Sequence, residues 1–118
     1  MAERIVARLA AAGLSVEQRG NLTLALAEAL SNAVVHGNRL SPEARVLVAV
    51  CVEPGQRVVI DVRDFGAGFN VAGLMDPCDA ERVLVPSGRG VFLMRHLVDY
   101  VGFNARGNRV RLIVRIRA

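Results

Sequence analysis

The stretch from Leu24 to Asn38 constrains the fold most, because it predicts a helix that is apolar over most of its surface and still carries a line of polar side chains. Glu28, Asn32 and His36 recur at every fourth residue, so they stack on one line of that helix. A buried polar group without a partner costs about 1 to 3 kcal/mol. We therefore expect this polar stripe of Glu28, Asn32 and His36 to face other polar atoms, a metal or a ligand.

The composition is that of one soluble globular domain. The chain has 118 residues, of which 53% are hydrophobic and 22% charged, so we expect a single domain over residues 1–118. The longest apolar run, Val46 to Val52, is far shorter than the roughly 20 residues that span a bilayer. The N-terminus has no secretory hydrophobic segment. These features predict a cytoplasmic protein without a membrane partner.

All 15 basic residues are arginines, and they give a net charge of +4. The absence of lysine from the sequence excludes a lysine nucleophile and a Walker-type phosphate lysine. Cys51 and Cys78 match no metal-ligand spacing, and we expect both to be free buried thiols.

Three helices are expected. Ala2 to Ala12 has helical spacing and ends before Gly13. Ser15, with Gln18 in capping-box position, begins the long second helix, which carries the polar stripe and ends near His36. The segment Ser87-Gly88-Arg89-Gly90 opens the third helix. Before the third helix, residues 70–87 show neither a helical nor a strand period, which is typical of a lid or binding loop.

Four strands are expected, in two hairpins. Arg45 to Val52 is predicted to be a largely buried strand, and Pro54-Gly55 is the turn into a second strand. Every second residue of this second strand faces the core, and Asp64 falls on one of these core-facing positions. Tyr100 to Asn104 and Arg109 to Arg117 form the closing hairpin, with the arginines of the last strand on a face open to water. This order predicts an α+β two-layer sandwich, with helices on one face of a mixed, mainly antiparallel sheet.

Three motifs carry possible chemistry, and each has a structural alternative. Glu28 and Asn32 could be only a helix-surface pair, or they could supply a carboxylate base and an amide ligand for Mg²⁺. Asp64 with Gly66 and Gly68 could be a plain turn, or it could accept a hydrogen bond from the exocyclic amine of a flat base. The segment Gly88-Arg89-Gly90 could be an N-cap, or it could be a phosphate site at a helix start.

The order of these motifs resembles the ATP-binding domain of the GHKL superfamily, known as the Bergerat fold, which includes gyrase-like ATPases and histidine kinases. Two segments look most like the anti-sigma-factor serine kinases, namely EALSNAVVHGN from Glu28 and PSGRGVFLM from Pro86. Histidine kinases usually have a basic residue where this chain has Val35. The family usually has a strand ahead of the first helix, and a threonine where this chain has Asn108.

The resemblance implies a role for each matching residue. It makes Glu28 the general base and gives Asn32 the Mg²⁺ ion. It puts His36 near the phosphates of ATP and Asp64 on the adenine amino group. Gly66 and Gly68 make room for the base, and Gly88, Arg89 and Gly90 hold the phosphates.

The function implied is that of an ATP-dependent protein serine kinase and anti-sigma factor. Such a protein transfers the γ-phosphate of ATP to a serine of an antagonist protein and also binds a sigma factor. A homodimer is compatible with this reading, and no direct contact with nucleic acid is expected. Two alternatives stay open: a non-catalytic ATP-gated protein-binding module and a histidine-kinase-like catalytic fragment.

Overall fold

The computed structural model describes residues 1–34, 45–64, 92–104 and 108–117. The elements follow one another in the order of the expected α+β sandwich: α1 (Ala2–Ala7), the 3₁₀ turn η1 (Ala10–Ala12), α2 (Val16–Asn32), β1 (Val46–Glu53), β2 (Arg57–Asp64), α3 (Phe92–Leu97), β3 (Tyr100–Phe103) and β4 (Arg109–Arg115).

The described strands form one antiparallel sheet in the order β1-β2-β4-β3. The β1–β2 hairpin turns at Pro54 and Gly55, as expected, and Gly55 has a φ of 73° that favours glycine. β4 then lies between β2 and β3, so the last strand of the chain is central rather than peripheral.

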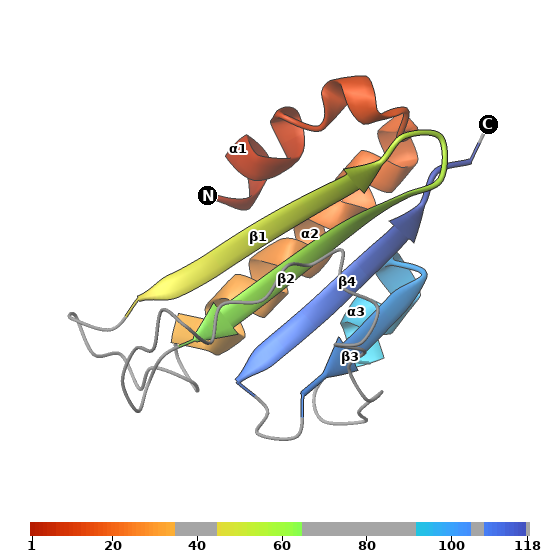
Figure 1. Cartoon of the computed structure of the whole chain (residues 1–118). Coiled ribbons are helices and arrows are strands. Elements are labelled where there is room, and N and C mark those ends of the chain that lie inside the picture. Colours follow the sequence, from red (N-terminus) through yellow and green to blue (C-terminus); the bar gives the residue numbers. More distant parts are fainter. Residues whose placement is uncertain (35–44, 65–91, 105–107, 118) are drawn as a thin grey trace.

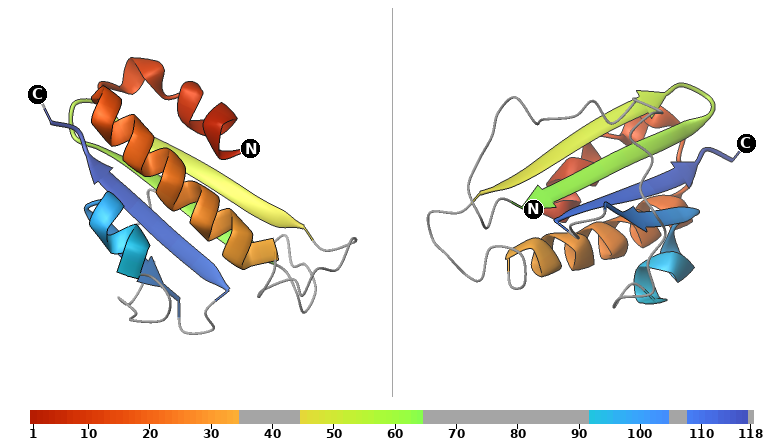
Figure 2. Two further views of the ribbon diagram at one scale, coloured as in Figure 1. Left: turned by 180° about the vertical axis from the view of Figure 1, so that it is seen from behind. Right: turned by 60° about the horizontal axis from the view of Figure 1, so that its bottom comes forward.

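The helices cover one face of this sheet (Figures 1 and 2). α2 runs lengthwise across it, contacts β4, and has α1 and α3 beside it. The largest fully buried core residues come from α2, β2, α3 and β4, namely Leu22, Leu26, Val58, Ile60, Val62, Met94 and Leu112. The two-layer α+β architecture predicted from the sequence is therefore confirmed.

The first helix is shorter than its spacing predicted. α1 ends at Ala7, and the remainder of the expected helix is the 3₁₀ turn η1. Gly13 then takes a φ of 98°, in the left-handed region, while an added Cβ would lie 3.3 Å from Ile116. Gly13 therefore ends the first helical segment, as expected, and lets the chain turn tightly into α2.

α2 begins as the sequence predicts. The Ser15 hydroxyl accepts a hydrogen bond from the Gln18 N–H at 3.0 Å, and the Gln18 side chain accepts one from the Ser15 N–H at 3.1 Å. The Gln18 amide also donates to the Arg115 carbonyl at 2.6 Å. The capping box therefore fixes the start of the helix and joins it to the end of β4.

α2 is apolar over most of its surface, as predicted, but its apolar residues are not all buried. Leu22, Ala25, Leu26 and Ala29 are buried, but Leu24 on the other side is 59% exposed. Within the described part of the chain no element covers this outer face, so α2 is buried along one stripe only.

Cys51 is disulfide-bonded, so the expectation of a free thiol at this position is wrong. Among the described residues, no helix has the length and apolarity needed to cross a membrane.

Candidate nucleotide site

The last two turns of α2 and the last residue of β2 lie at the same end of the molecule (Figures 1 and 2). Glu28 and Asn32 are half-buried on α2, at the border between its buried and exposed faces. Within the described residues, neither side chain makes a hydrogen bond or ion pair, and the helix-surface pair between them is not formed. Two polar side chains at the edge of the core are thus without a protein partner among the described residues.

Asp64 completes this end of the site from the sheet. It is 7% exposed and shares its parity with Val58, Ile60 and Val62, whose side chains belong to the core under the helices. The prediction that Asp64 is aimed toward the helical layer is therefore confirmed. Its backbone N–H donates to the Asn108 carbonyl at 2.9 Å, so its position depends on the turn that precedes β4.

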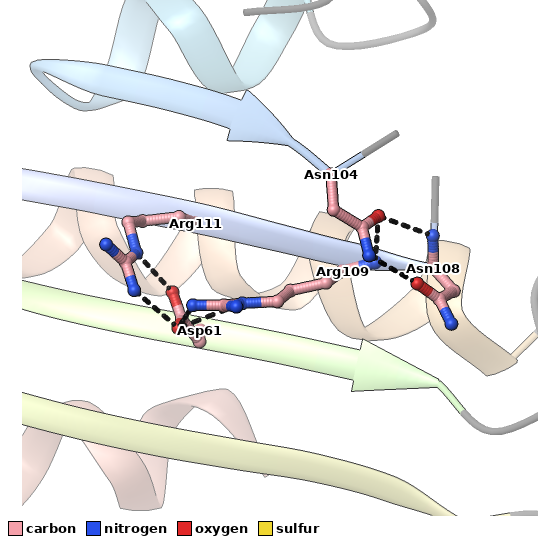
Figure 3. A network of polar contacts seen from close by, with 5 residues as sticks. All are labelled: Asp61, Asn104, Asn108, Arg109 and Arg111. Carbon is pink, nitrogen blue, oxygen red and sulfur yellow. Dashed lines mark hydrogen bonds and ion pairs between the residues drawn. The ribbon is translucent and has the colours of Figure 1, made fainter. Parts of the chain in front are cut away.

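The Asn104 side chain shapes that turn (Figure 3). Its Oδ1 accepts hydrogen bonds from the N–H groups of Asn108 at 3.1 Å and Arg109 at 3.2 Å. Its Nδ2 donates to the Asn108 Oδ1 at 2.6 Å. Asn108, where the family usually has threonine, thus has its side chain bound to Asn104 and its carbonyl bound to Asp64.

We expect Asn104→Ala to lower the free energy of unfolding by about 1 to 3 kcal/mol, because two backbone N–H groups and one side-chain amide lose their partner together. Chemical denaturation measures this loss. Asn104→Asp keeps an oxygen for both N–H groups, and a flipped Asn108 amide can donate to the second oxygen, so most of the stability should return. Equal losses in the two variants would contradict this role for the Asn104 oxygen.

Behind this site, on the face of the sheet opposite the helices, Asp61 binds two arginines (Figure 3). Arg111 donates to Asp61 from Nε at 2.8 Å and from a terminal nitrogen at 3.0 Å, and Arg109 donates from Nε at 3.1 Å. All three residues are buried, with 5% of Asp61, 2% of Arg109 and 6% of Arg111 exposed. The expectation that the arginines of the last strand all face water is therefore wrong at Arg109 and Arg111.

This Asp61–Arg109–Arg111 cluster crosses from β2 to β4. Arg111 is the register partner of Asp61, whereas Arg109 reaches it diagonally. Burial lowers the pKa of the Arg109 guanidinium, the attraction of Asp61 opposes that shift, and Arg111 and Arg63 add to the lowering. A guanidinium remains charged in any case, so the carboxylate is held by two positive charges in a dry environment.

The remaining predicted site residues lie outside the described residues: His36, Gly66, Gly68, Gly88, Arg89 and Gly90. The loop expected over residues 70–87 lies outside them as well. The described residues fit a nucleotide with Mg²⁺, since Asn32 offers an amide oxygen, Glu28 a carboxylate and Asp64 a buried acceptor.

Comparison with known proteins identifies the family. The sequence model of the "histidine kinase-like ATPase domain" matches residues 1–114, nearly the whole chain. The chain belongs to the histidine kinase-like ATPase family. This membership agrees with the antiparallel sheet, with the helices on one face of it, and with the GHKL resemblance of the motifs.

Within this family, the domain is similar to two anti-sigma F factors. It is 28% identical to that of Anoxybacillus flavithermus over 96 residues, which cover 80% of this chain and 65% of the relative. It is 30% identical to that of Bacillus cytotoxicus over 89 residues, which cover 74% of this chain and 60% of the relative. The chain thus spans less than two thirds of the length of either relative.

Sequence reasoning missed two polar networks, the Asp61–Arg109–Arg111 cluster between β2 and β4 and the Asn104–Asn108 pair in the turn between β3 and β4. Asp61, Arg109 and Arg111 all have the outward parity of their strands, which is a signal for a cross-strand pair. The sequence alone does not tell which strands are neighbours, however, and β2 and β4 are separated by more than forty residues of chain.

Proposed function

We propose that this domain is an ATP-dependent protein serine kinase of the anti-sigma type, which transfers the γ-phosphate of ATP to a serine of an antagonist protein and binds a sigma factor. The observation that carries the proposal is the pair of Glu28 and Asn32, half-buried and without partners among the described residues, at the end of the molecule where Asp64 ends β2. Membership of an ATPase family and similarity to two anti-sigma F factors support it.

In this proposal each described residue has one task. The Asp64 carboxylate would accept a hydrogen bond from the adenine amino group, and the Asn32 amide oxygen would hold Mg²⁺, which would neutralise charge on the phosphates. The Glu28 carboxylate takes the proton of the attacking serine hydroxyl. Phosphoryl transfer depends mainly on positioning and charge neutralisation, which suits a site built from one helix border and one strand end.

The residues outside the described ranges keep the roles that the family motif gives them. His36 would lie near the phosphates, and Gly66 and Gly68 would leave room for the base. Gly88, Arg89 and Gly90 would hold the phosphates through backbone N–H groups and a guanidinium.

Glu28→Gln tests the chemical role directly, since it removes the base and keeps the shape of the side chain. We expect phosphoryl transfer to a serine-bearing antagonist to fall by about a hundredfold or more, the usual contribution of a general base, while ATP affinity changes by less than about threefold. The measurements are transfer of labelled phosphate and calorimetric titration with ATP. The matched control is Glu17→Gln, an exposed carboxylate in the first turn of the same helix, which should change neither.

Two results would count against the base role. Loss of ATP binding in Glu28→Gln would make Glu28 a binding residue. Absence of phosphoryl transfer in the unaltered protein, with ATP binding intact, would favour a nucleotide-gated binding module in place of a kinase.

A further inference from the structure

The outer side of α2, which faces away from the sheet (Figure 2), carries a row of apolar and small residues without a charge. Val16 is 77% exposed, Leu24 59% and Val34, in the turn just after the helix, 44%. The side of a helix that faces water usually carries charged residues. This outer row consists of exposed residues that follow one another every three or four positions, namely Val16, Gly20, Leu24, Ala27, Ser31 and Val34.

The spacing of the outer row fits a second helix. Residues three and four positions apart stay on one side of a helix, where another helix can lie lengthwise along them. Leu24 projects between Gly20 and Ala27, whose small size leaves room for the side chains of that helix. The apolar face of an amphipathic helix binds protein surfaces of this kind. The row has no charge that could hold the phosphates of a nucleic acid.

Gly20 is an independent sign of a close approach to this side of α2. Glycine in the interior of a helix costs about 1 kcal/mol relative to alanine. Its backbone does not have the positive φ that favours glycine, and a Cβ added to it would meet no atom within 4 Å. Among the described residues, neither backbone conformation nor packing therefore requires glycine here. A glycine lets the backbone of a second helix come near.

The outer row borders Glu28 directly. Leu24 lies four residues before Glu28 and Ser31 lies three residues after it, so both are its neighbours on the helix surface. On its other side, Ala25 and Ala29 are buried. A protein segment that brings a hydroxyl group within hydrogen-bond reach of the Glu28 carboxylate therefore lies against the outer row.

We propose that the outer row of α2 is the docking surface for the antagonist protein, which lays the apolar face of an amphipathic helix along it and so brings its serine beside Glu28. The proposal rests on the proposed function for the role of Glu28. In the transfer step the serine oxygen bonds to the γ-phosphorus of ATP, the bond from that phosphorus to the β–γ bridging oxygen breaks, ADP leaves, and Glu28 takes the hydroxyl proton.

The position of Glu28 also decides between the two partners of the proposed function. A substrate has to place its serine next to this carboxylate, and the outer row is the apolar surface of α2 that adjoins it. A sigma factor receives no phosphate, and one docked on this row would keep the serine away from Glu28. The outer row therefore takes the substrate, and the sigma factor binds elsewhere.

Binding of a synthetic peptide to the whole chain, without nucleotide, tests the docking surface. The probe is an amphipathic helical peptide with leucine at its a and d positions, lysine and glutamate in equal number at the others, and one serine. We expect saturable binding by fluorescence anisotropy, with a dissociation constant raised about tenfold or more in Leu24→Arg. The control Val52→Arg, at a partly exposed apolar residue near the β1–β2 turn, should bind like the wild type.

Gly20→Leu separates docking from stability. Leucine is a better helix former than glycine, and nothing within the chain obstructs a side chain at this position, so the melting temperature should rise. The same side chain fills the space that the second helix needs, so peptide binding should weaken about tenfold. A variant that is more stable and binds the peptide as tightly as the wild type would contradict the close approach at Gly20.

Phosphoryl transfer to the serine of the peptide connects the docking surface to the site. With ATP and Mg²⁺, Leu24→Arg should raise the KM for the peptide about tenfold and leave kcat and the affinity for ATP unchanged. Peptide binding without any transfer would count against the proposed kinase activity and not against the docking surface. A wild type that does not bind the peptide, or a folded Leu24→Arg whose peptide affinity and KM equal those of the wild type, would overturn the docking proposal.

Discussion

Replacing Asp61 with alanine should lower the free energy of unfolding by about 3 to 5 kcal/mol, the usual cost of breaking a buried ion pair. The carboxylate of Asp61 holds both Arg109 and Arg111, and all three residues are buried. Without it, two guanidinium groups stay buried beside each other and lose the carboxylate that both of them bind. For a chain of this size the loss corresponds to a melting temperature lower by about 10 to 25 °C.

The controls for Asp61→Ala separate burial from the mere presence of an ion pair. Asp61→Asn keeps one acceptor oxygen and should lose less stability than Asp61→Ala. Arg117→Ala breaks the ion pair of Arg117 and Asp99, in which the Arg117 side chain is 69% exposed, and should cost less than about 1 kcal/mol. Similar losses in Asp61→Ala and Arg117→Ala would show that the Asp61–Arg109–Arg111 cluster is not dry.

Replacing Asp64 with alanine should lower the affinity for ATP by about 10- to 150-fold, the equivalent of one charge-assisted hydrogen bond. Calorimetric titration measures the affinity, and circular dichroism checks the fold. The effect is large because Asp64 is buried on the helix side of the sheet. In the alanine variant, no water would be available there to accept the hydrogen bond of the adenine amine in place of the carboxylate. Asp99→Ala, at the other end of β4, is the control and should leave ATP affinity unchanged.

A second nucleotide makes this prediction specific to the base. Inosine triphosphate has an oxygen in place of the exocyclic amine of ATP, so the wild type should prefer ATP. In Asp64→Ala this preference should largely disappear, because the acceptor that recognises the amine is gone. An unchanged preference in the variant would mean that Asp64 does not contact the base.

The parts of the fold that could be predicted from the sequence are those governed by local rules. The capping box of Ser15 and Gln18 and the turn at Gly55 depend on neighbours within a few residues, and both are confirmed. The inward direction of Asp64 followed from the period of two in the sequence of β2, although residues on both faces of β2 are buried. These features specified the α+β class and one end of the candidate site.

The parts that could not be predicted depend on which distant strands are neighbours. Alternation assigned Arg109 and Arg111 to the outward face correctly, but whether that face is wet depends on Asp61 across the sheet. Similarly, Leu24 is an apolar residue that would be expected in the core, and yet it is exposed. The helices beside α2 do not cover the outer side of α2. In both cases the local pattern did not determine whether the side chain is exposed to water, because that depends on which other elements cover it.

Calorimetric titration of the whole chain with ATP, with and without Mg²⁺, alongside Asn32→Ala, tests most directly whether the end of α2 and the end of β2 form a site for ATP with Mg²⁺. We predict binding of one ATP per chain that is stronger with Mg²⁺, and loss of the Mg²⁺ effect in Asn32→Ala because the amide oxygen is gone. No binding of ATP to the wild type, with or without Mg²⁺, would contradict the existence of this site.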